Sequence, residues 1–144
     1  MHYSLKALRL LIIENSRNKA INEGSLGYKD ELPIVKAKII IEGANGPVTM
    51  SANQMLYEKG ILVVPDILAN GGGVVVSYFE WVQDIVWLFW TEEEVRSKLQ
   101  SIMYRSFDKV FEFSQKNQKN MRASAMAVSL LRLEKAMLLR GLAW

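Results

Sequence analysis

Residues 37–66 read AKIIIEGANGPVTMSANQMLYEKGILVVPD and contain two short runs of aliphatic, mostly β-branched side chains. The first run covers residues 38–42 and ends in the turn-forming segment 43–47 (GANGP). The second run covers residues 61–64 and ends at residues 65–66 (PD). Such runs, when they stop at glycine, proline, asparagine or aspartate, are typical of buried strands. We therefore predict a strand in each run.

A short helix is predicted between these two strands. Residues 51–59 place Met55 and Leu56 on one helical face, with Ser51 as the expected N-cap and Gly60 as the stop. A strand, a helix and a strand in this order predict two parallel strands joined by a right-handed crossover. In an open α/β sheet of this kind, ligands bind outside the carboxyl ends of the strands.

The following part of the chain contains one ambiguous segment and two clear helices. Residues 70–81 (NGGGVVVSYFEW) fit a buried strand or a buried helix, and their periodicity alone favours a strand. Residues 91–94 (TEEE) form a capping-box pattern, and apolar residues repeat at helical spacing through residues 95–111. A second helix is predicted over residues 122–140, with Gly141 as its stop.

Composition indicates a single globular domain of ordinary polarity. The chain has 144 residues, of which 50% are hydrophobic and 23% charged, so it can bury a core without a disulfide or metal staple. It has no cysteine, which excludes disulfides and thiolate metal sites, and we assign no metal ligand. Residues 9–14 (RLLIIE) predict one further strand near the N-terminus.

Charge and hydropathy argue against nucleic-acid-binding, membrane and secreted proteins. The net charge is +3, but the basic residues are scattered among acids, so no nucleic-acid partner is expected. The solvated face of the last helix is interpreted as containing Arg122, Arg132, Lys135 and Arg140. The longest apolar run, residues 74–90, is interrupted by polar side chains, so no membrane span is expected. Residues 1–16 resemble no secretion signal, and a cytoplasmic location is expected.

Asn45 and Asn70 follow the two strand signals and are the first candidates for ligand contact. An asparagine side chain donates and accepts hydrogen bonds without adding charge, which suits a nicotinamide ribose or carboxamide. Asparagine before glycine also favours turn geometry, so a purely structural role is the alternative. The glycines at 71–73 would let a ligand approach the backbone or would simply make a tight turn, and Ser77 offers a hydroxyl to a carboxylate.

Four consecutive segments resemble the glutamate dehydrogenase family. They are residues 37–47 (AKIIIEGANGP), 60–70 (GILVVPDILAN), 74–81 (VVVSYFEW) and 90–95 (WTEEEV). The resemblance implies an α/β fold with an incomplete Rossmann-like parallel sheet that is flanked by helices and ends in long C-terminal helices. It also implies that the segment after the glycines is a helix, which we adopt in place of the strand.

The resemblance further implies which residues contact ligands. Those expected to bind NAD or NADP are Gly43, Ala44, Asn45 and Asn70. Those expected to bind glutamate or 2-oxoglutarate are Gly73, Val74 and Ser77. Ser77 is the residue implied to bond the side-chain carboxylate of glutamate. No catalytic residue is assigned, because the lysine and aspartate that move protons in the family have no counterpart in this chain.

The sequence departs from the family pattern in two places, and each departure leads to a prediction. No G-x-G-x-x-G turn occurs, so the helix N-terminus that would hold the pyrophosphate is missing. Residues 84–89 (DIVWLF) replace a usually polar segment and, with unpaired strand edges, predict packing on another chain in a homo-oligomer. We expect residues 1–144 to form a single truncated NAD(P)-binding-type domain. In this domain, residues 1–35 match the family weakly, residues 36–90 form the cofactor and substrate wall, and residues 91–144 form the C-terminal helices.

Two functions from different classes follow from the resemblance. The family reaction in amino acid metabolism is the NAD(P)-dependent oxidative deamination of L-glutamate to 2-oxoglutarate and ammonia, an oxidoreductase activity. This chain alone is expected to lack full activity, because only one wall is available to orient the reactants. The alternative is a non-catalytic remnant or binding module that oligomerises or docks with full-length subunits.

Overall fold

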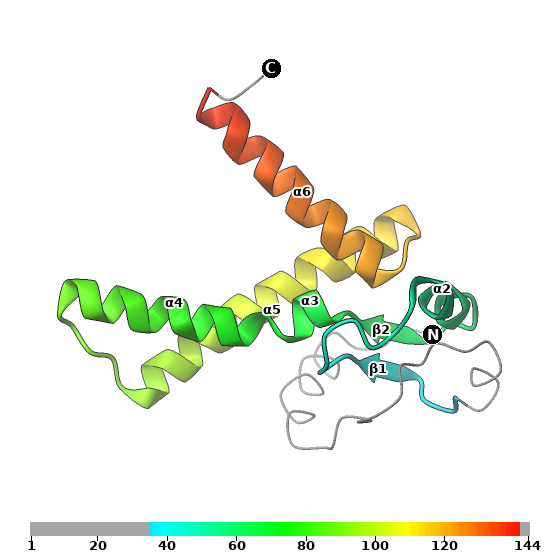
Figure 1. Ribbon diagram of the computed structural model, residues 1–144, viewed down its shortest axis with the longest axis horizontal. Coiled ribbons are helices and arrows are strands. Elements are labelled where there is room, and N and C mark those ends of the chain that lie inside the picture. Colours follow the sequence, from blue (N-terminus) through cyan, green and yellow to red (C-terminus); the bar gives the residue numbers. More distant parts are fainter. Residues whose placement is uncertain (1–34, 142–144) are drawn as a thin grey trace.

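The computed structural model describes residues 35–141, and the strand predicted at residues 9–14 lies outside this part. A two-stranded parallel sheet lies among the helices (Figure 1). Strand β1 (Ile39–Ile41) pairs with β2 (Leu62–Val64) in a register that places their last residues opposite each other. Both strands therefore end at the same edge of the sheet, as the strand, helix, strand pattern predicts.

Helix α2 (Met50–Glu58) connects the two strands. Its N-cap is Thr49 and not the predicted Ser51, because Thr49 has extended backbone and its hydroxyl accepts from the Ala52 N–H at 3.3 Å. Ser51 lies inside the first turn, where its hydroxyl is 3.3 Å from that of Thr49. Gly60 follows the helix with φ +73°, in the left-handed conformation that a glycine stop provides.

The glycine and valine segment is helical. A four-residue helix, α3 (Asp66–Ala69), leads into α4 (Gly71–Val86). The strand that periodicity alone favours is therefore wrong, and the helix implied by the family resemblance is confirmed. Consecutive valines fit both patterns, but the apolar character continues over 16 residues, which is longer than most strands. Gly71 and Gly72 lie against α5 (Glu92–Asn117), close to the Met103 sulfur.

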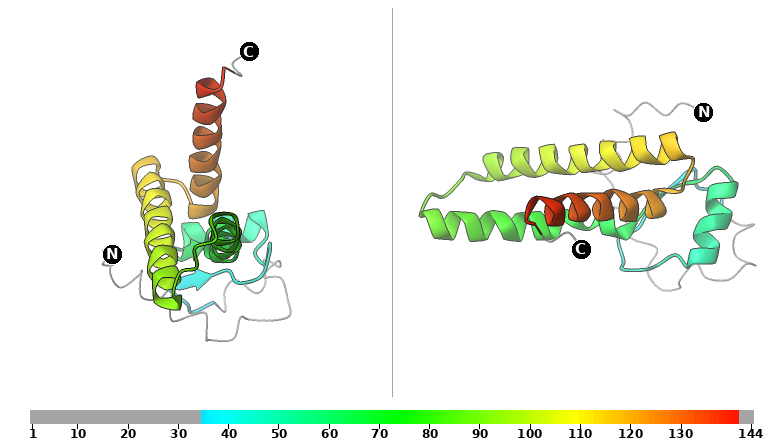
Figure 2. Two further views of the ribbon diagram at one scale, coloured as in Figure 1. Left: turned by 90° about the vertical axis from the view of Figure 1, so that its left-hand side faces the viewer. Right: turned by 90° about the horizontal axis from the view of Figure 1, so that it is seen from above.

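The last two helices begin at well-formed caps. The predicted capping box of α5 is present between Thr91 and Glu94. Helix α6 (Met121–Leu139) is capped by Asn120, whose side chain accepts from the Ala123 N–H at 2.9 Å. Helices α4 and α5 run side by side, whereas the C-terminal half of α6 projects away from the other described elements (Figures 1 and 2).

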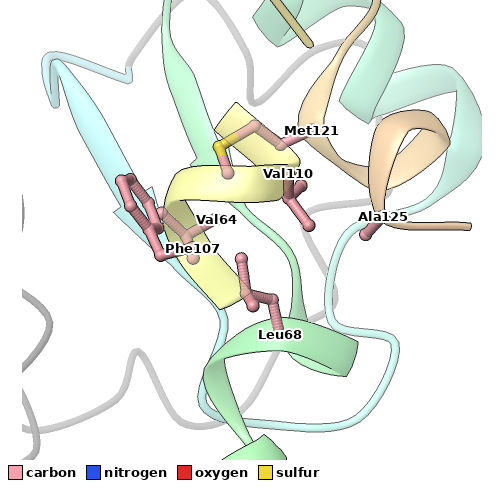
Figure 3. Close-up of a cluster of buried hydrophobic side chains, with 6 residues drawn as sticks. All are labelled: Val64, Leu68, Phe107, Val110, Met121 and Ala125. Carbon is pink, nitrogen blue, oxygen red and sulfur yellow. The ribbon is translucent and has the colours of Figure 1, made fainter. Parts of the chain in front are cut away.

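Alternate residues of the two strands feed two hydrophobic clusters on opposite faces of the sheet. The cluster that faces α5 and α6 contains Val64, Leu68, Phe107, Val110, Met121 and Ala125 (Figure 3). The cluster that faces α2 contains Val48, Ala52, Leu56 and Val63. The sheet is therefore sandwiched between α2 and the C-terminal helices, and its carboxyl edge has a fixed position relative to the start of α6.

Candidate functional site

Asn45 and Asn70 meet at the carboxyl edge of the sheet. Asn45 lies in the turn after β1, and Asn70 separates α3 from α4. The Asn70 side-chain Nδ2 donates to Asn45 Oδ1 at 3.1 Å, and both residues are exposed. An amide has two donor hydrogens and two acceptor lone pairs, so this bond uses only part of the capacity of either side chain.

The turn that carries Asn45 is open to solvent and anchored at its far end. Gly43 and Ala44 are both exposed, and a Cβ placed on Gly43 would have no atom within 4 Å. Gly46 has φ +62°, which favours glycine, and its N–H donates to Asp66 Oδ2 at 2.6 Å. The predicted cofactor residues of this turn are thus brought to one accessible edge, with room for a ligand next to the backbone.

The three predicted substrate residues lie on the exposed side of the first two turns of α4. Gly73 and Val74 precede Ser77 by four and three positions, which places all three on one helical face. Val74 is 72% exposed, and a Cβ on Gly73 would have no atom within 4 Å. The Gly73 N–H donates to the Asn70 carbonyl oxygen at 3.3 Å, so this face begins directly beside the asparagine pair.

A buried ionic cluster lies beneath the asparagine pair, and it was not predicted. The side chain of Arg122, in the first turn of α6, donates to Asp66 Oδ1 at 2.9 Å and forms a second ion pair with Glu42 Oε2. Glu42 also accepts from the Asp66 backbone N–H at 2.8 Å. The Glu42 side chain has no exposed surface, and the interpretation of Arg122 as a solvated residue is therefore wrong.

The cluster favours the charged forms of Asp66 and Arg122. Burial alone would raise the pKa of Asp66, but hydrogen bonds from the Gly46 and Ile67 N–H groups and from Arg122 lower it below its ordinary value. Burial alone would lower the pKa of Arg122, but the bonds to the two carboxylates raise it. The arginine therefore stays protonated and Asp66 stays ionised at neutral pH.

The sequence contains a signal for the two carboxylates of this cluster but none for its cation. An acidic residue stands at the end of each strand run, with Glu42 as the last residue of the first run and Asp66 one proline beyond the second. Parallel strands bring these carboxylates to one edge, where burial requires a cation or hydrogen-bond donors. In the part of the chain from residue 35 to residue 141, no group of three or more histidine, cysteine or acidic side chains is placed to hold a metal ion. The cation is instead Arg122, which no local pattern connects to the strands.

Comparisons with known proteins agree on one family. The family model described as glutamate/leucine/phenylalanine/valine dehydrogenase matches residues 17–141. The NADP(+)-dependent glutamate dehydrogenase of Pyrobaculum calidifontis is 46% identical over 114 residues, which are 78% of this chain and 27% of that protein. The NAD-specific glutamate dehydrogenase of Staphylococcus aureus is 45% identical over 113 residues, again 78% of this chain and 27% of the relative.

Solved structures give the same result. Glutamate dehydrogenase from Peptoniphilus asaccharolyticus aligns with a TM-score of 0.80 and 34% identity over 94% of this chain and 35% of that one. The hetero-hexameric glutamate dehydrogenase from Thermus thermophilus, in its Leu-bound form, aligns with a TM-score of 0.74 and 40% identity. The alignment covers 82% of this chain and 28% of that one. The chain thus spans about a quarter of the length of the curated relatives it matches.

Proposed function

Because the chain belongs to the glutamate/leucine/phenylalanine/valine dehydrogenase family, we propose that its carboxyl sheet edge is one wall of a nicotinamide nucleotide and amino acid site. The observation that carries the proposal is the hydrogen bond between Asn45 and Asn70, at the edge where open α/β sheets bind their ligands. The two amides supply uncharged donors and acceptors next to open backbone at Gly43 and Gly73.

These residues fit the nicotinamide half of a dinucleotide better than its phosphates. Asn45 and Asn70 are neutral, and the backbone from Gly43 through Ala44 is exposed, with no atom within 4 Å of a Cβ placed on Gly43. The chain has no G-x-G-x-x-G turn, so pyrophosphate binding is not assigned to it. Curated relatives are named both as NADP(+)-dependent and as NAD-specific enzymes, so either nucleotide is a candidate ligand.

The face of α4 formed by Gly73, Val74 and Ser77 is proposed to hold the amino acid. Ser77 would donate its hydroxyl to the side-chain carboxylate of glutamate, and Val74 would pack against the aliphatic part of the substrate. The proposed reaction is the oxidative deamination of L-glutamate to 2-oxoglutarate and ammonia. Nicotinamide, when bound, supplies the hydride acceptor for oxidation at the α-carbon. The residues of this chain contribute binding and orientation, and none of them is assigned a proton-transfer role.

A nuclear magnetic resonance titration tests this proposal. The side-chain amide signals of Asn45 and Asn70 in the labelled chain should shift on addition of NADH or NADPH. ADP-ribose, which lacks the nicotinamide ring, is the matched control and should leave these signals in place. Equal shifts with both compounds, or shifts confined to other residues, would contradict a nicotinamide wall at this edge.

A second proposal concerns association, and it rests on the apolar surface of α4 and α6. The C-terminal end of α4 and the segment that follows it expose Ile85, Val86, Trp87, Leu88 and Phe89. The projecting helix α6 exposes Met126, Leu130, Leu131, Leu133, Leu138 and Leu139. Large apolar side chains exposed in such numbers are characteristic of protein contact sites. We propose that copies of this chain, or a full-length subunit of the same family, cover it.

The proposed setting is the cytoplasm, with residues 36–90 as the ligand wall and 91–144 as its helical support. Within the described part of the chain, no helix combines the length and apolarity that crossing a membrane requires. A binding module without catalysis is the alternative to an enzyme component. It would share the nucleotide site and the apolar surface but would add no activity when mixed with full-length subunits.

A further inference from the structure

Arg122 joins two sheet-end segments that are far from it in the sequence. It lies 80 positions after Glu42 and 56 positions after Asp66, yet it forms ion pairs with both side chains. Its neighbours in α6, Met121 and Ala125, are buried in the cluster below the sheet. The position of the guanidinium is therefore set by the packing of α6 against β2 and not by the surface loops.

Both candidate asparagines are connected to this cluster through short contacts. Asp66 uses Oδ2 to accept from the Gly46 N–H, and Gly46 directly follows Asn45. The carbonyl oxygen of Asp66 accepts from the Asn70 N–H at 2.8 Å, which closes α3 at Asn70. Asp66 therefore contacts the backbone on both sides of the asparagine pair.

We propose that Arg122 is a positioning residue, which through Asp66 and Glu42 holds the turn after β1 and the start of α4 at the separation that lets Asn45 bond Asn70. This proposal rests on the proposed function in that the pair serves as the nicotinamide wall. Helix α6 does not reach the ligand itself, but its first turn sets the geometry of the wall.

The charges in this cluster show what removing Arg122 would do. The cluster holds two carboxylates and one cation, and Glu42 Oε2 already accepts from the Asp66 backbone N–H. Without the cation, two negative charges face each other in a buried place, which is unfavourable for both. The repulsion lowers stability, whereas the positioning is lost for a separate reason. Without the bond from Arg122, the Asp66 side chain that accepts from the Gly46 N–H is no longer tied to α6, and the turn that carries Asn45 loses its anchor.

The first test compares Arg122→Met with Arg132→Met in the full chain, because Arg132 is an exposed residue of the same helix. In the Arg122 variant we expect the Gly46 backbone amide signal and the side-chain amide signals of Asn45 and Asn70 to move, and the contact between the two side chains to disappear. The Arg132 variant should keep all of these signals. Unchanged Gly46 and asparagine signals in a folded Arg122→Met protein would overturn the proposal.

A double variant separates positioning from general stabilisation. Glu42→Gln combined with Arg122→Met removes the repulsion and should recover most of the lost thermal stability, but it should not restore the asparagine contact. Recovery of both the stability and the wild-type asparagine signals would show that the arginine is only structural. This variant also keeps the test informative should Arg122→Met alone fail to fold.

Nucleotide affinity provides the second readout. If the wild-type chain binds NADH, Arg122→Met and the double variant should bind about tenfold more weakly, while Arg132→Met binds as wild type. Unaltered affinity in all variants would contradict the positioning role. If the wild-type chain binds no nucleotide, the proposed function fails, and the asparagine signals still decide whether Arg122 positions the pair.

Discussion

Arg122 Nη1 lies 2.9 Å from Asp66 Oδ1, and this ion pair ties the first turn of the last helix to the end of β2. The Asp66 side chain also accepts from the Gly46 N–H, and the Asp66 carbonyl oxygen accepts from the Asn70 N–H. The exposed candidate wall therefore rests on a buried charge cluster whose members come from three separate parts of the chain.

The first prediction concerns the stability that the cluster contributes. Arg122→Met leaves Glu42 and Asp66 without their cation, and removing one partner of a buried ion pair costs about 3 kcal/mol of unfolding free energy. Arg132→Met removes the same charge from an exposed place and should change the unfolding free energy by less than about 0.5 kcal/mol. Urea unfolding followed by circular dichroism measures both values, and similar losses in the two variants would contradict the cluster's role.

The pH dependence of stability provides a second prediction. Because the pKa of Asp66 is lowered from its ordinary value of 3.8, its contribution to stability is fully present above that value and is lost as pH falls below it. In that range the unfolded state takes up the proton first. Asp66→Asn should therefore lose less stability than wild type between about pH 5 and about pH 3. The pKa of Glu94 is also lowered, so the comparison is made in a Glu94→Gln background, which removes the contribution of that carboxyl group to the pH dependence.

Two glycine substitutions should have opposite effects. Gly72→Ala places a Cβ 3.8 Å from Leu99 Cδ1 and 3.9 Å from Met103 Sδ, which are ordinary contact distances in a helical segment. It should raise the unfolding free energy by about 0.5 kcal/mol. Gly46→Ala forces a side chain into left-handed backbone at φ +62° and should lower it by about 1 kcal/mol. Melting temperatures in the same buffer test the sign, and a stabilising Gly46→Ala would contradict the described turn.

The apolar surface predicts concentration-dependent association. Trp87 and Phe89 are 83% and 71% exposed, and burying them against another chain removes a large apolar area from water. Replacing both with serine should shift the sedimentation profile toward the monomer. The matched control is Lys135→Ser on α6, which alters an exposed polar position and should not change the profile. A wild-type chain that stays monomeric at high concentration would rule out self-association through this surface.

Local sequence patterns predicted most of the elements around the site. The β-branched runs gave β1 and β2, and the Thr91 capping box gave the start of α5, because each signal depends on neighbouring residues alone. The α2 cap was misplaced by two residues, since Thr49 and Ser51 are both good capping residues. Only the backbone conformation distinguishes them.

The ion cluster could not be predicted in the same way. Its carboxylates were visible at the ends of the strand runs, but the choice of Arg122 as their cation depends on how α6 packs across the sheet. Helix periodicity placed Arg122 on a polar face, where a solvated role is the usual interpretation. Asn45 and Asn70 were both expected at strand ends, but Asn70 follows α3, which lies between it and β2. Their contact and mutual hydrogen bond required the structure.

Titration of the purified chain with NADH and NADPH tests whether the asparagine pair forms a nicotinamide wall. Trp81 lies four residues beyond Ser77 on α4, so quenching of tryptophan emission reports on a nucleotide bound there. We expect saturable quenching that Asn45→Ala and Asn70→Ala abolish and that Asn117→Ala, on the surface of α5, preserves. No quenching up to about millimolar nucleotide, or the same binding curve for all three variants, would contradict the nicotinamide wall.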